Sequence, residues 1–231
     1  MRALLFTTGS PFARAVRILL DELELDYERR EEITTPSVED RVRATPTLQV
    51  PTFWDGVQTL WESGTIADYL LATYAHRPPA EPPLARDLFR PEAEWQDKLT
   101  FATIQTFGNA ATTISQMKWG GIGLADSAHL QRSAEKLTTI LRWLDNRLGG
   151  VGDGFQAGCA SVQDIFLAAH VRFVQARPLG IDLDLRQFPK VSALLDRLDE
   201  RDSFKANPIW WWEPGITGYQ PDGTPIYGKA R

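Results

Sequence analysis

The chain has 231 residues, 43% of them hydrophobic and 24% charged, with eight Trp and eleven Phe. This composition excludes a globally disordered protein, and the length allows two small domains with separate cores. The net charge is only −5 and the basic residues are scattered among acidic ones, so we expect no nucleic-acid partner.

The cysteine content and the hydropathy pattern bear on the cellular compartment. Cys159 is the only cysteine, which excludes an internal disulfide and a CxxC motif and is typical of a reducing compartment. The apolar residues 3–6 are too few for a signal peptide, and no apolar run approaches the roughly 20 residues that span a bilayer. We therefore expect a cytoplasmic protein with no membrane partner.

The first 30 residues predict a strand, a helix and the approach to a second strand. Residues 2–7 are a short apolar run typical of a buried strand, and Gly-Ser-Pro at residues 9–11 supplies a turn. Pro11 suits the first turn of a helix, where its missing N–H has no partner anyway. The apolar positions of this helix share one face: Val16, Leu19, Leu20 and Leu23. Residues 26–30 lead into the second strand.

A strand hairpin and a second helix are expected next. Residues 34–47 contain turn residues and two prolines, so we expect an irregular segment with room for one short helix. Residues 50–54 and 59–61 predict two strands, because Asp-Gly between them is a hairpin signal. Ser63 is then the expected N-cap of a helix. The N-terminal α/β domain is predicted to span residues 1–76.

Prolines and helical patterns predict the remaining organisation. Four prolines within residues 76–83 cannot continue a helix, so residues 77–85 are predicted to be a linker. Residues 86–206 are predicted to form an all-helical domain, since their apolar residues recur at helical spacing. Residues 207–231 are rich in Pro, Gly and aromatic residues and are expected to form an irregular aromatic tail.

Three motifs occur in order along the chain. Residues 10–18 read Ser-Pro-Phe-Ala-Arg-Ala-Val-Arg-Ile, residues 49–51 read Gln-Val-Pro with Glu-Ser at 62–63, and residues 160–165 read Ala-Ser-Val-Gln-Asp-Ile. Together they resemble the motifs of the cytosolic glutathione transferase family, in its bacterial form with a serine in the opening motif. The resemblance implies a thioredoxin-like domain that binds glutathione, followed by an all-α helical-bundle domain that binds an electrophile.

The resemblance implies that Ser10 is the catalytic residue, because the serine of this motif faces the sulfur of glutathione in the family. A hydroxyl that donates a hydrogen bond to the sulfur stabilises the thiolate and lowers the thiol pKa from about 8.5. Thr7 and Thr8 are neighbouring hydroxyls that could act instead. Ser10 could also serve only as the N-cap of the helix that follows.

The resemblance also implies six glutathione-binding residues: Phe12, Gln49, Val50, Pro51, Glu62 and Ser63. A cis proline would turn the backbone of Val50 outward, where it could pair with the cysteinyl unit of an extended peptide. The helix N-terminus near Ser63 would attract the γ-glutamyl carboxylate, and Glu62 would accept from the γ-glutamyl ammonium. The alternative is that Ser63 is only a helix cap and Glu62 only a surface acid.

The sequence departs from the family pattern at several positions. Gln49 stands where a lysine often approaches the glycyl carboxylate, and Arg14 and Arg43 are candidate replacements for that lysine. Ala15 also stands where lysine is common. Val162 and Gln163 replace small residues of the third motif.

Ser161 and Asp164 fit a reciprocal capping box, which we interpret as structural. Cys159 lies far along the chain from Ser10, which disfavours thiol transfer by a cysteine. The three histidines (His76, His129 and His170) lack ligand-like spacing, so no metal and no cofactor other than the co-substrate glutathione are expected. His170 is interpreted as a core histidine.

The leading hypothesis is conjugation of glutathione to small hydrophobic electrophiles, a detoxification reaction, in a homodimer implied by the resemblance. Two alternatives stay open: a glutathione-dependent peroxide or disulfide reductase, and a non-catalytic protein that binds apolar ligands or other proteins. The tail carries three consecutive tryptophans at residues 210–212, which should pack onto the body because an exposed apolar patch is improbable. They could line the electrophile site or only fasten the C-terminus.

Overall fold

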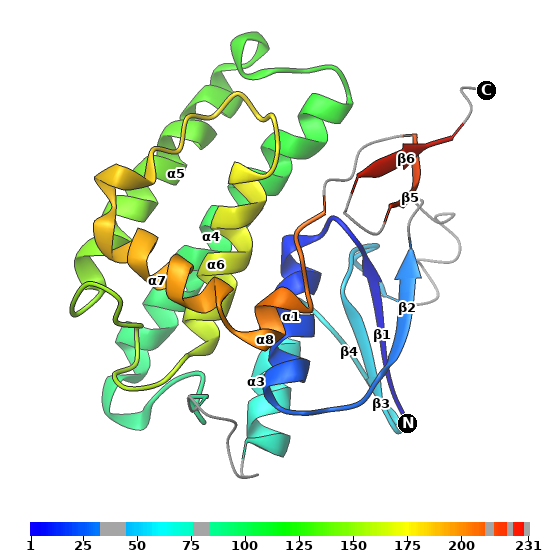
Figure 1. Cartoon of the computed structure of the whole chain (residues 1–231), viewed down its shortest axis with the longest axis vertical. Helices are drawn as coiled ribbons and strands as arrows, with labels where there is room; N and C mark the ends of the chain where they lie inside the picture. Colours follow the sequence, from blue (N-terminus) through cyan, green and yellow to red (C-terminus); the bar gives the residue numbers. More distant parts are fainter. Residues whose placement is uncertain (33–44, 76–83, 211–214, 221–223, 229–231) are drawn as a thin grey trace.

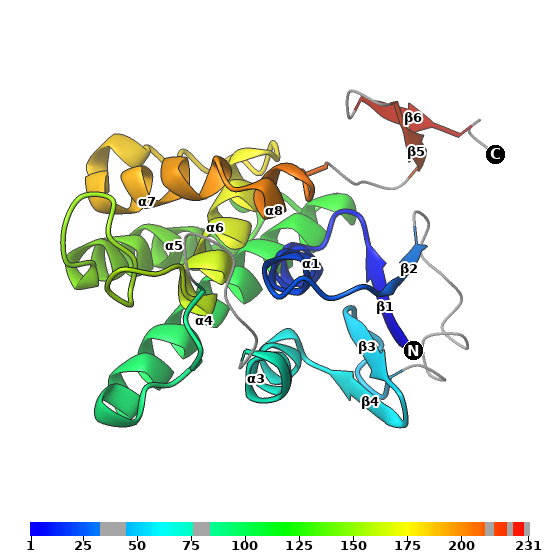
Figure 2. The same ribbon diagram turned by 60° about the horizontal axis from the view of Figure 1, so that its bottom comes forward.

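The computed structural model describes residues 1–32, 45–75, 84–210, 215–220 and 224–228. The N-terminal part is a four-stranded sheet with helices, and the C-terminal part is a bundle of helices (Figure 1). This arrangement agrees with the α/β region and the all-helical region that the sequence predicts. The helices of the N-terminal part lie between the sheet and the bundle (Figure 2).

The sheet has the strand order β2-β1-β3-β4. The strands are β1 (Arg2–Thr7), β2 (Glu28–Glu32), β3 (Thr52–Asp55) and β4 (Gln58–Trp61). β1 pairs with β2 in parallel and with β3 in the antiparallel sense, with Leu4 opposite Phe53. The hairpin expected between β3 and β4 is present, and Gly56 at its turn has a φ of 59°, which glycine adopts at little cost.

Two helices of the N-terminal part cover the sheet face turned to the bundle: α1 (Pro11–Glu22) and α3 (Ser63–Tyr74). Pro11 occupies the first turn of α1, as predicted. The expectation that Ser63 caps α3 is wrong, because Glu62 is the N-cap residue and no side chain makes a capping hydrogen bond. The first N–H groups of α3 are therefore left without the side-chain partner that we expected.

The bundle is built around α6. Its helices are α4 (Glu94–Trp119), α5 (Ala128–Arg147), α6 (Val162–Gln175), α7 (Pro189–Asp199) and the short α8 (Asp202–Lys205), with 3₁₀ turns at Pro91–Ala93, Leu124–Asp126 and Leu185–Gln187. Every residue of α6 except Arg172 and Gln175 is buried, as its apolar pattern predicts. Among the described helices, none has the length and apolar character needed to cross a membrane.

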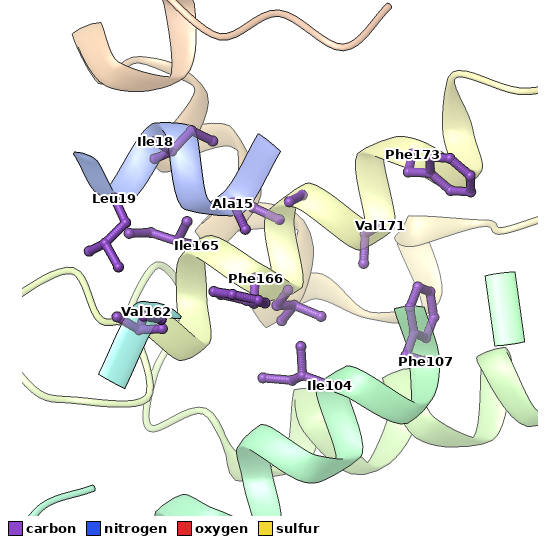
Figure 3. Packing of buried hydrophobic residues seen from close by; sticks show 14 of the residues in the cluster. Ala15, Ile18, Leu19, Ile104, Phe107, Val162, Ile165, Phe166, Val171 and Phe173 are labelled. Atoms are coloured by element: carbon purple, nitrogen blue, oxygen red, sulfur yellow. The ribbon is translucent and has the colours of Figure 1, made fainter. Parts of the chain in front are cut away.

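The two parts of the protein share one apolar core, in which α6 packs against α1 on one side and α4 on the other. In Figure 3, Ala15 and Leu19 of α1 lie on the side of the helix that faces Ile165 of α6, and Phe166 of α6 lies on the side toward Ile104 of α4. All of these side chains are fully buried. The position of the sheet relative to the bundle therefore depends on this packing.

Polar contacts join α1 to the C-terminal end of the bundle. The buried carboxylate of Glu22 accepts from Arg201 Nε at 2.7 Å and also from Arg201 Nη2 and the hydroxyl of Ser203. Asp21 accepts from Asn207 Nδ2 at 2.6 Å. These contacts fix the direction in which the chain leaves α8, because every partner except Asp21 is buried or nearly so.

The described part of the tail differs from the irregular segment that we expected. Strands β5 (Ile216–Tyr219) and β6 (Pro225–Tyr227) form an antiparallel pair with an irregularity between Ile216 and Gly218. Ile216 is buried. Short strands interrupted by glycine and proline carry no clear alternation, which is why the sequence pattern did not predict this pair. Trp211 and Trp212 lie outside the described residues.

The capping box before α6 has the geometry expected from the sequence. Ser161 Oγ accepts from the Asp164 N–H at 3.2 Å, and Asp164 Oδ2 accepts from the Ser161 N–H at 2.8 Å. Asp164 Oδ1 also accepts from the N–H of Phe155 at 2.9 Å. Both residues of the box are fully buried, so their polar groups have little access to water.

We predict that Asp164→Ala destabilises the fold more than Ser161→Ala does. The serine variant should cost about 1 kcal/mol, as for loss of a helix cap. The aspartate variant should cost roughly 2 to 4 kcal/mol, because it leaves two N–H groups inside the protein without an acceptor. Urea denaturation of the two variants measures both values, and equal losses would contradict the assigned role of Asp164.

Candidate functional site

Two adjoining cavities lie where the sheet part meets the bundle. The smaller encloses about 170 Å³ and the larger about 460 Å³. Four residues line both cavities: Phe12, Gln49, Val50 and Asn109. The smaller is also lined by Thr47, Pro51, Glu62, Ser63 and Gln105, and the larger also by Thr7, Gly9, Ser10, Pro11, Thr112, Thr113, Ser115, Gln116, Trp119 and Phe173. The structure thus gathers Ser10 and all six predicted binding residues around these two adjoining cavities.

The N-terminus of α3 forms one wall of the smaller cavity. Glu62, the residue before the helix, has φ 64° and ψ 112°, in a region that residues other than glycine seldom adopt. Backbone strain of this kind persists where surrounding structure enforces it, and it concentrates at functional sites. The uncapped N–H groups and the positive end of the helix dipole make this wall suited to an anion.

Val50 and Pro51 form a second wall, at the start of β3. The peptide bond between them is cis, as the sequence comparison with the family implied. The ladder between β1 and β3 begins at Thr52, so the backbone of Val50 lies outside it. An extended peptide could pair with this backbone in the manner of an added strand.

Ser10 lies at the N-terminus of α1 and lines the larger cavity. Its Oγ accepts a hydrogen bond from the Ala13 N–H at 3.2 Å, so the residue is an N-cap. Within the described part of the chain its O–H has no acceptor, and a hydroxyl can accept and donate at the same time. Thr8 is buried and donates to Glu31 at 2.5 Å, so of the two alternative hydroxyls that the sequence offered, Thr7 is the one that lines the cavity.

Comparison with known proteins identifies the fold and the N-terminal domain. Residues 4–79 match the family model described as glutathione S-transferase, N-terminal domain. The fold is similar to that of a glutathione S-transferase from Methylobacterium radiotolerans solved with glutathione sulfonate, with a TM-score of 0.72 and 24% identity over 89% of this chain and 93% of that chain. It is also similar to a glutathione S-transferase from Methylobacillus flagellatus solved with glutathione bound, with a TM-score of 0.70 and 22% identity over 90% of this chain and 98% of that chain.

Residues 4–79 thus match the N-terminal domain of glutathione S-transferases, and the chain as a whole has the glutathione transferase fold. The predicted fold class, a thioredoxin-like α/β domain with a helical-bundle domain, is thereby confirmed. The roles of the individual site residues stay predictions.

Of the two candidate replacements for the lysine of the glutathione transferase motif, only Arg14 lies within the described residues, and it lines neither cavity. Arg14 points away from them: it is buried, its Nε donates to the carbonyl oxygen of Asn207 at 2.7 Å, and its guanidinium lies 5.4 Å from the Phe204 ring centre. Burial lowers the pKa of Arg14 to about 10. Arg43 lies outside the described residues. Gln49 itself lines both cavities, so a neutral amide occupies the place of the lysine.

Sequence reasoning missed the residues that α4 contributes to the cavities. Five of them recur at spacings of four and three and therefore share one helix face: Gln105, Asn109, Thr112, Gln116 and Trp119. This stripe of mostly polar residues, in a helix whose other face is apolar, was a sequence signal that could have indicated a site-lining face. The function of this stripe could not be predicted, because only the packing of α4 against α6 and beside the start of α3 turns it toward the site.

The remaining expectations concern cysteine and metal chemistry. Cys159 lines neither of these cavities, and burial raises the pKa of its thiol. In the described ranges, no cluster of three or more His, Cys, Asp or Glu residues could hold a metal ion. His129 is exposed, and His76 lies outside the described residues.

His170 is fully buried behind the cavity wall, and burial lowers its pKa from 6.5 to about 3. The unfolded chain therefore takes up a proton below pH 6.5 that the folded chain does not.

We predict that His170 makes the folded state less stable as the pH falls from 6.5 toward 3, by about 1.4 kcal/mol per pH unit. His170→Gln should lack this loss in urea denaturation at pH 6.5, 5.5 and 4.5. The control His129→Gln should keep it, and parallel pH slopes for His170→Gln and the wild type would contradict the assignment.

Proposed function

We propose that the protein binds glutathione and catalyses conjugation of its thiolate to small hydrophobic electrophiles. The observation that carries this proposal is that Ser10, Val50 and the N-terminus of α3 line two adjoining cavities, with Val50 lining both. In the proposed complex these three groups face the sulfur, the cysteinyl backbone and the γ-glutamyl end of one extended tripeptide. Two glutathione S-transferases with the same fold, one solved with glutathione sulfonate and one with glutathione, support it.

The proposed reaction needs an ionised thiol and a positioned electrophile. The glutathione thiol loses its proton to solvent, the sulfur then forms a bond to an electrophilic carbon, and a leaving group departs with its electron pair. Ser10 donates its O–H to the thiolate, while its Oγ keeps the hydrogen bond from Ala13. A fall of two pKa units from about 8.5 raises the thiolate fraction at pH 7 about 25-fold, so positioning must supply the rest of the catalysis.

The larger cavity is the proposed electrophile site. Aromatic rings of Phe12, Trp119 and Phe173 line it beside the hydroxyls of α4. Its volume of about 460 Å³ falls within the range of sites for small organic ligands. A flat apolar electrophile placed there would lie next to Ser10 and hence next to the sulfur.

The two alternative functions have less support. Disulfide exchange through an enzyme thiol is disfavoured, because the single cysteine of the chain, Cys159, lines neither of the two cavities. A non-catalytic role gives no account of the Ser10 O–H beside the cavity, for which the described residues offer no acceptor. Turnover of an aryl halide, compared with turnover of a peroxide, separates conjugation from the other readings. A cytoplasmic location and a role in detoxification belong to the same proposal and fit a protein with one cysteine.

The first test concerns Ser10. We predict that Ser10→Ala raises the pKa of enzyme-bound glutathione by one to two units toward about 8.5, with glutathione still bound. Turnover at neutral pH should fall roughly tenfold, and much of it should return as the pH rises. The ultraviolet absorbance of the thiolate across pH measures the shift. Coincident titration curves for variant and wild type would transfer the role to Thr7, for which Thr7→Val is the matched variant.

The second test concerns Glu62, proposed to accept from the γ-glutamyl ammonium. We predict that Glu62→Ala weakens glutathione binding about tenfold or more, since a charged hydrogen bond contributes roughly 1.5 to 3 kcal/mol. The free energy of unfolding should change by less than that, because Glu62 makes no capping hydrogen bond. Titration calorimetry and urea denaturation measure the two quantities. A loss of binding that merely follows a loss of folding would count against the assignment.

We also propose that the protein is a homodimer. Large apolar side chains are exposed on α4 and on the edge strand β4: Trp95 is 74% exposed, Leu99 is 56% exposed and Trp61 is 38% exposed. Exposed apolar side chains of this size are typical of surfaces that associate.

We predict that Leu99→Asp combined with Trp95→Ala shifts the protein from twice the mass of one chain to the mass of one chain. Sedimentation equilibrium measures the mass. Val151→Asp, which places the same charge at a different exposed apolar residue, is the matched control and should stay dimeric. A wild-type protein that sediments at the mass of one chain would refute the dimer.

A further inference from the structure

His170 lies directly behind the candidate site, although it lines neither cavity. Its ring makes an edge contact with Phe12, which lines both cavities, at 4.6 Å between ring centres. On the other side the ring packs against α4, where a methyl group added at Gly108 would lie 2.6 Å from it. The ring fits because position 108 is glycine. His170 is therefore held between a wall residue of the site and the helix that forms the opposite wall.

The only hydrogen bond of this ring within the described part of the chain joins its Nε2 to Oε1 of Gln105, at 3.4 Å. Nδ1 is buried without a partner. A buried N–H without an acceptor costs more than a buried lone pair without a donor. The neutral ring therefore carries its proton on Nε2 and donates it to Gln105.

This hydrogen bond orients the amide of Gln105. Because Oε1 accepts from His170, the NH₂ group occupies the other side of the amide. Gln105 Nε2 lies 3.2 Å from where a methyl group on Gly64 would be, so it adjoins the first turn of α3. Glu62, Ser63 and Gln105 line the smaller cavity together. An amide donor from the bundle thus faces the same space as the N–H groups of α3.

The charges around the smaller cavity indicate which ligand group this amide donor would bind. Glutathione carries two carboxylates and one ammonium group. The described residues that line the cavity include one acid, Glu62, and neither lysine nor arginine. A carboxylate placed beside Glu62 therefore needs neutral donors, and helix N–H groups together with an oriented amide supply them.

We propose that Gln105 binds the α-carboxylate of the γ-glutamyl unit of glutathione through its NH₂ group, and that His170 is a positioning residue that fixes the direction of this amide. The inference rests on the proposed glutathione site and adds to it a contact from the helical part. A flipped amide would point its oxygen at the carboxylate, which is repulsive. Loss of the His170 donor should therefore weaken binding without removing Gln105.

The experiment measures dissociation constants by titration calorimetry for glutathione and for 4-aminobutanoyl-Cys-Gly, which lacks only the α-carboxylate. Gln105→Met, which keeps the length of the side chain, should weaken glutathione binding about tenfold and leave the affinity for the analogue nearly unchanged. Gln105→Glu should weaken glutathione binding further, because it places a charge opposite the carboxylate. An equal effect of Gln105→Met on both ligands would overturn the inference.

The positioning role is tested by rescue and by coupling. His170→Leu should weaken glutathione binding severalfold, and His170→Gln should restore most of it, because a glutamine side chain can place an N–H near the position of Nε2. His170→Leu in the Gln105→Met background should have no further effect. Additive losses in this double-mutant cycle would overturn the role of His170. Melting curves at pH 7 show whether each variant folds, and His170→Asn takes the place of a His170 variant that does not.

Failure of this inference is distinguishable from failure of the proposed function. A wild-type protein that does not bind glutathione would refute the proposed function. A wild-type protein that binds glutathione tenfold or more tightly than the analogue, with Gln105→Met showing the same preference, would refute only the contact assigned to Gln105.

Discussion

The packing of α1 against α6 is the constraint on which the site depends. α1 carries the Ser10 turn at its start and lies between the sheet and the bundle (Figure 2). Ala15 is small enough to let the two helices approach closely (Figure 3). Arg177, just after α6, donates from Nη2 to the carbonyl oxygen of Gly9 at 2.8 Å. The turn that presents Ser10 is thus held by both parts of the chain, and the two cavities lie at the interface between the sheet part and the bundle.

Buried polar groups determine how the helices at this interface are oriented. Asp164 defines where α6 begins, because it satisfies N–H groups of two residues that approach the helix. The contacts of Glu22 with Arg201 fix the end of α1 relative to α8. Such ion pairs contribute little net stability when compared with apolar contacts, since both charges lose their water. Their effect is to exclude other relative positions of the helices, which a purely apolar interface would tolerate.

The sequence predicts those parts of the fold and site that local chemistry decides. The Asp55-Gly56 hairpin, Pro11 in the first turn and the capping box of Ser161 with Asp164 involve residues a few positions apart, and each has the expected geometry. Ser63 was assigned the wrong position because Glu62 adopts a positive φ, which no local pattern indicates. The roles of Gln105 and His170 could not be predicted, since their contact joins residues 65 positions apart.

In the proposed complex the smaller cavity would recognise charge with oriented dipoles, because the described residues that line it include neither lysine nor arginine. The usual lysine is a glutamine here, and Arg14 is used inside the protein to hold the carbonyl group of Asn207. The smaller cavity instead adjoins the N–H groups of a helix on one side and the amide of Gln105 on the other. Dipoles act over a shorter range than charges and depend strongly on direction. A site built in this way would need its donors held rigidly. The strained backbone of Glu62 and the hydrogen bond from the buried His170 to Gln105 would both serve that need.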